Sequence, residues 1–163
     1  MSAIISSCGT YRYRLERPDV FGDFSTAIIM VNPSTADATD NDATIRKLIG
    51  FRNLKGWGHL IVGNLFAYRA TDVRELATAS DPMGPENDDR LAEIFDDAQQ
   101  VVFAWGPTAK LPQRLRDRWR HVDALARKMG HAPLCIGATA KDGQPRHPLM
   151  LAYTEPMQNW IPA

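Results

Sequence analysis

Four short runs of apolar residues along the chain predict four buried strands. Each run is rich in β-branched or aromatic residues and is continuous, as in strands that are covered on both faces of a parallel sheet. The runs are Ala27–Val31, Leu60–Phe66, Val101–Trp105 and Pro133–Gly137. We therefore expect these segments to form the centre of a sheet.

Helical patterns separate these strands. Apolar side chains recur at helical spacing over Asp42–Leu54, before Gly56, and again over Asp88–Ala98. The longest pattern begins at Pro112, a favourable first helical residue, and runs to Met129. Alternation of strands and helices predicts one α/β domain over residues 1–163, a three-layer sandwich around a four-stranded parallel sheet.

Two further segments predict antiparallel strands at the edges of this sheet. Tyr11–Leu15 alternates between aromatic or apolar and basic residues, as an edge or antiparallel strand does. Leu149–Tyr153, near the end of the chain, is a second candidate.

Composition limits the function classes. The 163 residues are 44% hydrophobic, enough for a real core, and 19 basic residues balance 19 acidic ones, so no overall positive field attracts nucleic acid. Cys8 and Cys135 lack disulfide or metal-ligand spacing and are expected to be reduced thiols; we predict no metal and no cofactor. No apolar run reaches the roughly 18 residues that cross a bilayer, so a cytoplasmic protein without a membrane partner is expected.

Charge is nevertheless segregated along the chain. Asp81–Asp97 holds seven acidic residues against one arginine, and Lys110–Lys128 holds seven basic residues against two acidic ones. The basic segment is expected to be the solvated face of an amphipathic helix, on which Arg116 and Arg120 lie opposite the apolar stripe. The alternative is that these basic side chains contact phosphate groups of a ligand.

Polar residues are dense after the first apolar run. They comprise Asn32, Ser34, Thr35, Asp42, Thr44 and Arg46. Side chains and backbone N–H groups at the approach to a helix are well placed for a ligand. The alternative is a capped turn, in which Asp42 caps the helix and Arg46 is solvated.

Asn64 interrupts the second apolar run and needs a hydrogen-bonding partner there. Its amide, with one donor and one acceptor, suits the edge of a nucleobase, or it ties a neighbouring loop. Phe66 and Tyr68 follow, and either stack on a base or fill the core; Arg69 is a further candidate for binding.

A third group of candidate residues follows the last two apolar runs. Val101–Trp105 is followed by Gly106, which permits close approach of a loop or ligand, and Trp105 itself is expected in the core. After the fourth run, Arg146 and His147 precede Pro148. His147 is the best candidate for a proton or hydrogen-bond donor near neutral pH, although a loop histidine is often merely solvent-exposed.

Longer signatures connect these segments. Five such segments identify the chain as a member of an uncharacterised bacterial and phage family. This family is a domain of unknown function and brings no established activity. The segments are Asn32–Asp37, Asp42–Arg46, Asn64–Asp72, Ala104–Gly106 and Pro145–Leu149.

More distantly, the chain resembles the uracil-DNA glycosylase superfamily. The matching elements, in order, are Asn32-Pro33, Asn64, Trp105-Gly106 and His147-Pro148. The resemblance implies a parallel sheet of strand order 2-1-3-4 and cleavage of an N-glycosidic bond. Asn32 would orient the attacking water, Asn64 would read the base, and His147 would donate to the departing base.

Three functions follow as alternatives. The first is a glycosylase-like protein that acts on a base in DNA, such as a modified or single-stranded base. The second is an enzyme or binder for a free nucleoside or nucleotide, which fits the zero net charge and the polar cluster of Ser34, Thr35, Thr44 and Arg46. The third is a non-catalytic adaptor that retains the fold. The first two share a nucleobase-containing ligand.

Overall fold

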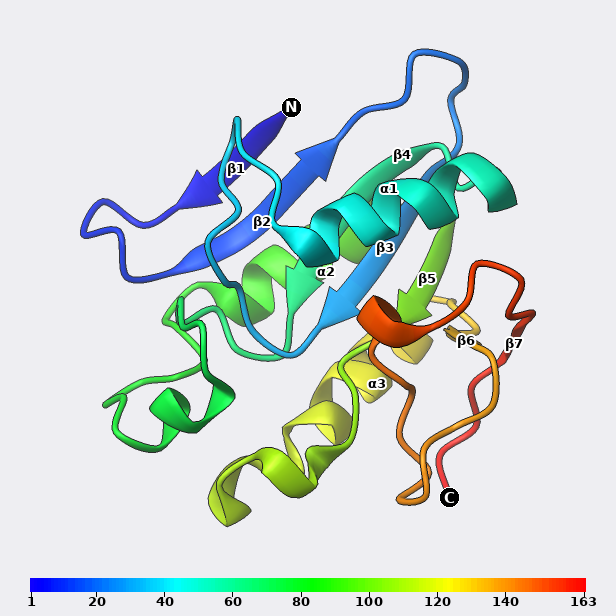
Figure 1. The fold of residues 1–163 in the computed structure, drawn as a ribbon. Coiled ribbons are helices and arrows are strands. Elements are labelled where there is room, and N and C mark those ends of the chain that lie inside the picture. The colour runs from blue at the N-terminus through cyan, green and yellow to red at the C-terminus, as the bar shows by residue number, and fades with distance from the viewer.

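The four predicted strands form the parallel centre of a seven-stranded mixed sheet in the computed structural model, which describes residues 1–163 (Figure 1). The parallel strands are β3 (Ser25–Met30), β4 (His59–Asn64), β5 (Gln100–Phe103) and β6 (Leu134–Ile136). Their spatial order is β4-β3-β5-β6, which confirms the expected order 2-1-3-4. Three antiparallel strands extend the sheet: β1 (Ser2–Ile5), β2 (Arg12–Arg17) and β7 (Met157–Asn159).

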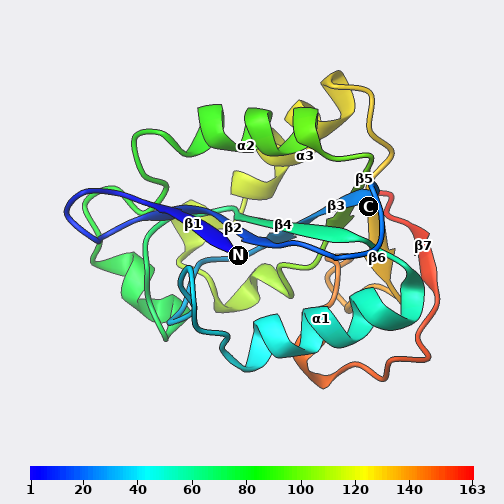
Figure 2. The ribbon, with the colours of Figure 1, turned by 90° about the horizontal axis from the view of Figure 1, so that it is seen from above.

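Helices cover both faces of the sheet, so the predicted three layers are present. Figure 2 shows α1 (Ala43–Lys55) on one face and α2 (Asn87–Asp97) with α3 (Arg118–Lys128) on the other. Each face has its own apolar core, built by the strands and by the helices that cover it. Four 3₁₀ turns complete the structure: η1 (Val73–Ala77), η2 (Thr108–Lys110), η3 (Gln113–Leu115) and η4 (Pro148–Met150). None of the helices has the length and apolar character needed to span a membrane.

Helix α1 begins and ends as its sequence predicts. The Asp42 side chain accepts a hydrogen bond from the Ile45 backbone N–H at 2.8 Å, so the expected cap is present. At the other end Gly56 adopts a φ of 67°, a left-handed conformation that glycine takes at little cost. The cap fixes the first turn of α1 close to the carboxyl ends of the parallel strands.

The predicted helix start at Pro112 is wrong. Pro112 has a ψ of 139°, which is extended backbone, and only the short turn η3 follows before α3 begins at Arg118. Leu111 and Leu115 are both buried in the core beneath α2 and α3. The chain therefore follows the core surface through this stretch, and tertiary burial overrides the helical spacing.

The predicted strand over Leu149–Tyr153 is also wrong. Residues Pro148–Met150 form η4, and the antiparallel edge strand is β7, which pairs with β6. The His147 side chain accepts from the Leu149 N–H at 3.2 Å, which favours a turn here, and Met150 is 90% exposed. The apolar residues at the start of this segment therefore lie in a turn at the surface.

Strand β2 is antiparallel, as predicted, but it is not at the edge because β1 pairs with its outer side. Their register shifts: Ile4 pairs with Arg14 and Ile5 with Arg12, so Tyr13 is an extra residue. Such a bulge reverses the alternation of side chains. Arg12 consequently becomes buried, which the alternating pattern did not predict.

Buried Arg12 and Arg17 both hold the loop between β3 and α1. Arg12 donates through Nη1 to the Ala36 carbonyl, and Arg17 donates to the Asp37 carbonyl at 2.6 Å. Arg17 also donates to the Asn41 side chain at 2.6 Å. Strand β2 thus positions the polar loop that follows the first apolar run.

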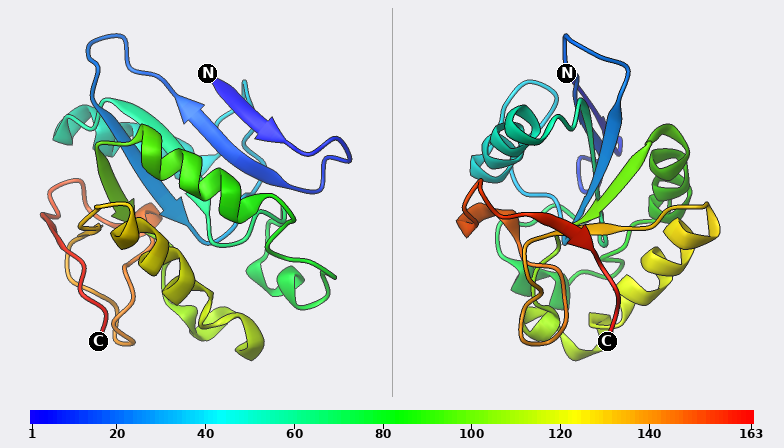
Figure 3. Two further views of the ribbon diagram at one scale, coloured as in Figure 1. Left: turned by 180° about the vertical axis from the view of Figure 1, so that it is seen from behind. Right: turned by 90° about the vertical axis from the view of Figure 1, so that its right-hand side faces the viewer.

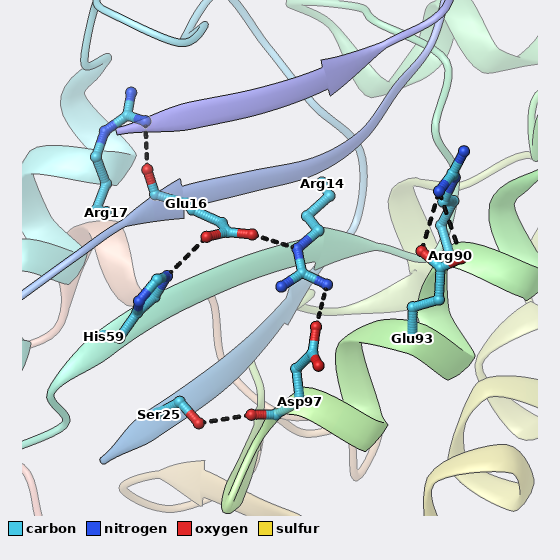
Figure 4. A network of polar contacts seen from close by, with 8 residues as sticks. All are labelled: Arg14, Glu16, Arg17, Ser25, His59, Arg90, Glu93 and Asp97. Atoms are coloured by element: carbon cyan, nitrogen blue, oxygen red, sulfur yellow. Dashed lines mark hydrogen bonds and ion pairs between the residues drawn. The ribbon is translucent and has the colours of Figure 1, made fainter. Parts of the chain in front are cut away.

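A network of charged side chains occupies the amino ends of the parallel strands (Figure 4). Glu16 contacts Arg14 at 2.6 Å and His59 at 2.9 Å, and Arg14 also pairs with Asp97 at 2.7 Å. Ser25 Oγ donates to the Asp97 carbonyl, which ties α2 to the start of β3. These charges serve the fold at the end of the sheet opposite to the polar loops.

The acidic and basic segments meet where α2 and α3 lie side by side (Figure 3). Arg118 pairs with Asp88, and its Nε donates to the Leu65 carbonyl at 3.1 Å. All five arginines of the basic segment have partners within the chain, four of them including backbone carbonyls. These arginines are Arg114, Arg116, Arg118, Arg120 and Arg127. Arg116 and Arg120 are exposed, as predicted for the solvated face of this segment, and the structure adds that its arginines also bond to the protein itself.

Candidate functional site

A cavity of about 790 Å³ opens beyond the carboxyl ends of β3 and β4. Its floor is formed by Met30, Val62 and Asn64, and the first turn of α1 forms one wall. The segment Ala70–Arg74 lines another side, and Lys110 and His147 complete the cavity. Carboxyl ends of parallel strands are the usual place for ligands in such sheets.

Six of the residues singled out in the sequence line this cavity. They are Asn32, Ser34, Asp42, Thr44, Asn64 and His147. They come from three separate parts of the chain, which the parallel sheet brings to the same edge. A smaller cavity of about 160 Å³ adjoins it, and Trp105, Gly106 and Pro107 contribute to its lining.

The Asn32 side chain presents an acceptor to the cavity. Its Nδ2 donates to the Ala70 carbonyl at 2.8 Å and to the Pro33 carbonyl at 3.1 Å. Both amide hydrogens are thereby used, while Oδ1 makes no hydrogen bond within the chain. Such an oxygen can orient a water molecule or accept from a ligand.

Asn64 is 1% exposed, and neither Nδ2 nor Oδ1 has a hydrogen-bonding partner. The side chain of Asn64 therefore does not hold a neighbouring loop, which was one of its two interpretations. Instead its backbone carbonyl accepts from the Asn87 side chain at 3.1 Å. A buried amide without a partner costs about 1–3 kcal/mol, so a partner from the cavity would satisfy it.

His147 is held as a neutral hydrogen-bond donor. Its Nδ1 accepts from the Leu149 N–H, so in the neutral ring Nε2 carries the hydrogen. Burial lowers the pKa of His147 below its ordinary value, more than the carboxylate of Asp42 raises it. The imidazole lining the cavity is thus uncharged at neutral pH and has Nε2–H free to donate.

Gly106 allows His147 to take this position. Its φ is 83°, and a Cβ there would lie 3.3 Å from Cβ of His147. The Gly106 N–H also donates to the Pro145 carbonyl at 2.9 Å, which fixes the loop before His147. Trp105 is buried, as predicted, and donates to Gln144 at 2.9 Å.

The two aromatic candidates lie outside the cavity. Phe66 is fully buried in the core under α2 and α3, which agrees with the core alternative. Tyr68 packs against the same core and contacts the Tyr11 ring edge to face. Neither ring is available to stack on a base in this cavity.

The remaining polar candidates also lie outside it. Thr35 is exposed, and Arg46 donates to the Asn41 carbonyl. Arg69 donates weakly to the Gly9 carbonyl at 3.4 Å, and Arg146 pairs with Glu155 at 3.2 Å. The three arginines therefore bond to loops near the cavity.

The structure adds four cavity residues that the sequence did not indicate, Arg12, Thr71, Asp72 and Arg74, and it places Lys110 of the basic segment in the lining. Asp72 and Glu75 form a capping box at η1, a spacing that could have been recognised. Hydrogen bonds from Arg74 lower the pKa of Asp72 to about 2. The two side chains therefore form an ion pair at the rim, and their charges largely cancel.

Neither cysteine nor any acidic cluster suggests a metal centre. Cys8 is exposed, Cys135 is buried, and both are free thiols. No group of three or more His, Cys, Asp or Glu side chains is arranged to hold a metal ion.

The fold defines an α/β protein with a cavity at the carboxyl edge of its parallel sheet. The family model described as "Protein of unknown function (DUF1643)" matches residues 12–149, and the chain belongs to this family. The matched range includes every residue that lines the cavity. Searches of curated proteins and of solved structures found no significant match.

Proposed function

We propose that this chain is a uracil-DNA-glycosylase-like protein that recognises a nucleobase in DNA and cleaves its N-glycosidic bond. The observation that carries the proposal is the convergence of Asn32, Asn64 and His147 in one cavity. The strand order β4-β3-β5-β6 agrees with the order that this resemblance implies.

Asn64 would bind the edge of the base. Its buried amide offers one donor group and one acceptor, the pattern needed for a base edge with adjacent N–H and carbonyl groups. A base that satisfies both atoms would be strongly preferred, because one that satisfies neither leaves the amide unpaired.

His147 would stabilise the leaving base. As the bond between C1′ of the sugar and the base nitrogen breaks, the base takes the electron pair and its carbonyl oxygen becomes negative. A neutral Nε2–H donor stabilises this charge most where water is excluded. The hydrogen bond from Leu149 to Nδ1 keeps the ring in the required tautomer.

Asn32 and Asp42 would act on the sugar side. The sugar passes through an oxocarbenium-like cation, to which water then adds, and the proton that this water loses ends on the anionic base. Asn32 Oδ1 would orient the water but cannot remove its proton. Asp42 lines the cavity with one carboxylate oxygen held by Ile45 N–H, and its negative charge would stabilise the cationic sugar.

A free nucleoside or nucleotide is the second candidate substrate. Duplex binding depends on basic side chains that are free to contact phosphates. In this chain the arginines of the basic segment are bonded internally, and the cavity rim combines Lys110 with the Asp72–Arg74 pair. That rim is neither a continuous basic track nor a closed acidic one.

The test is release of free base. The purified protein would be incubated with single- and double-stranded oligonucleotides that carry normal, deaminated or alkylated bases, and in parallel with the corresponding nucleosides and nucleotides. Abasic sites would be detected by strand cleavage, and released bases by chromatography. We expect release from one substrate class to be lost in Asn32→Ala and in His147→Ala, and retained in the control His121→Ala, which alters an exposed histidine of α3.

Base release that is equal in all these variants would contradict the mechanism. Nucleobase binding without any release would favour a binding protein, and absence of both would favour the adaptor alternative.

A further inference from the structure

A buried guanidinium faces the cavity in which we propose that the nucleobase binds. Arg12 is 3% exposed and lines the cavity. Its backbone N–H donates to the Ala67 carbonyl at 2.9 Å, which places Arg12 on the strand next to the end of β4. Arg12 and Asn64 therefore line the same cavity from two adjacent strands.

No carboxylate forms an ion pair with Arg12, and Asp42 and Asp37 act on its charge only from a longer distance. Nη1 donates to the Ala36 carbonyl, and Nε is buried without a partner. Burial lowers the pKa of Arg12 to about 10, so the group stays charged at neutral pH. The matched residue Arg17 differs, because its Nε and Nη atoms all donate to the protein. A buried charge with free donor capacity is costly unless a ligand neutralises it.

Other donors surround the same space. The N–H groups of Ile45 and Arg46 donate to Asp42. The N–H groups of Ala43 and Thr44, also in the first turn of α1, have no partner. Free N–H groups at a helix start favour anions. Lys110 adds a positive charge to the lining, and Asp42 a negative one. The Asp72–Arg74 pair contributes no net charge, so a single positive charge remains.

We propose that Arg12 binds a phosphate group of the substrate, assisted by the first turn of α1, so that the protein takes a nucleotide phosphate in preference to a bare nucleoside. The planar guanidinium can donate to two phosphate oxygens at once, which an ammonium cannot do. The nucleotide part of this inference rests on the proposed function; the phosphate site rests on Arg12 itself. The cavity volume of about 790 Å³ lies in the range that holds a ligand of nucleotide size.

The phosphate site is tested without any nucleobase by thermal unfolding. The wild type, Arg12→Met and the control Arg14→Met, which alters an arginine of β2 at the opposite end of the sheet, would be heated in inorganic phosphate and in chloride at matched ionic strength. We expect phosphate to raise the Tm of the wild type and of Arg14→Met, and to leave that of Arg12→Met unchanged. Equal effects of the two anions on the wild type, or an equal phosphate effect in Arg12→Met, would overturn the proposal.

Arg12→Lys is the second variant, in case Arg12→Met does not fold. It keeps a positive charge in the buried position but loses the two-pronged donor. We expect it to bind phosphate several-fold more weakly than the wild type. Undiminished binding by Arg12→Lys would show that the guanidinium does not form the site.

The substrate class is tested by calorimetric titration with nucleoside 5′-monophosphates, the matching nucleosides and short single-stranded oligonucleotides. Loss of a buried charge partner is expected to weaken monophosphate binding by about tenfold or more in Arg12→Met. Nucleoside binding should be the same in Arg12→Met and the wild type. Unchanged discrimination between monophosphate and nucleoside in Arg12→Met would refute the phosphate role.

Titration with oligonucleotides distinguishes the two possible sources of the phosphate group, a free nucleotide and the DNA backbone. Binding of mononucleotides alone assigns the site to a free nucleotide, and equal or tighter binding of oligonucleotides that depends on Arg12 assigns it to the DNA backbone. Anion binding with no base release from any substrate would contradict only the proposed hydrolysis. Base release that is insensitive to Arg12 would contradict only the phosphate site.

Discussion

The side-chain amide of Asn87 donates to the backbone carbonyls of both Asn64 and Leu65, at 3.1 Å each. Asn87 is the first residue of α2 and is 1% exposed. Helix α2 therefore fixes the backbone at the end of β4, from which the Asn64 side chain enters the cavity. A residue on one layer of the sandwich thus sets the position of a candidate binding residue in another.

The contact predicts a stability effect of Asn87→Ala. Two buried hydrogen bonds are lost, and the Asn64 carbonyl is left without its side-chain donor. We expect the free energy of unfolding to fall by roughly 2–3 kcal/mol. Urea denaturation measures it, with the exposed Asn53→Ala as the control, which should change stability by less than about 0.5 kcal/mol. A loss no larger than that of the control would mean that the contact does not hold β4.

Asn64→Leu separates stability from binding. The substitution removes a buried amide whose two polar atoms have no partner and replaces it with an apolar side chain of similar size. We expect stability to be unchanged or to rise by about 1 kcal/mol, because the cost of the unpaired amide disappears. Nucleobase binding, measured by calorimetry, should be lost. A strongly destabilised variant would indicate that the amide has a structural partner.

His147 predicts a pH dependence of stability. Its folded-state pKa lies below its ordinary value of 6.5, so the unfolded chain binds the proton first as pH falls. The contribution of His147 is fully present above about pH 6.5 and is lost as pH falls from there through the folded-state pKa.

His147→Asn is the matched variant, because its side-chain oxygen can still accept from the Leu149 N–H while the titrating ring is gone. Chemical denaturation of both proteins between neutral and mildly acidic pH measures the difference. We expect the wild type to lose more stability on acidification than His147→Asn. Identical pH profiles of the two proteins would refute a lowered pKa for His147.

Asp42 predicts a different outcome for two substitutions. Asparagine retains the cap on α1 but removes the negative charge, whereas alanine removes both. Asp42→Asn should keep the stability of the wild type, and Asp42→Ala should lose about 1 kcal/mol. If the carboxylate stabilises a cationic sugar, both variants should lose base release to a similar extent. Full activity of Asp42→Asn would limit Asp42 to its structural role.

Much of the fold could be predicted from local patterns. The apolar runs are strands because residues covered on both faces must be continuously apolar, and the helices α1 and α2 follow their spacing to within a residue or two. The start of α3 could not be predicted, because burial of Leu111 and Leu115 overrode the helical spacing. The absence of a strand at Leu149–Tyr153 could not be predicted either, because the contact of His147 with the Leu149 N–H favours a turn.

The site was predicted in part. Asn32, Asn64 and His147 could be recognised because polar residues at or beyond the carboxyl ends of buried strands meet at one edge of the sheet. Arg12 was missed because it appeared as one basic residue in an alternating strand, and nothing local marks the bulge at Tyr13 that buries it. Arg69 and Arg146 were included on their charge alone, and they bond to loops outside the cavity.

Local patterns in the amino-acid sequence specify which segments are buried strands, where α1 starts, and which polar groups lie near the carboxyl edge, because spacing and capping act over a few residues. How these groups are used depends on the tertiary structure. It paired the basic segment with α2 and with backbone carbonyls, turned Arg12 into the cavity, and left Asn64 buried without a partner. Partners and burial depend on residues far apart along the chain, and the pattern within one segment carries no information about them.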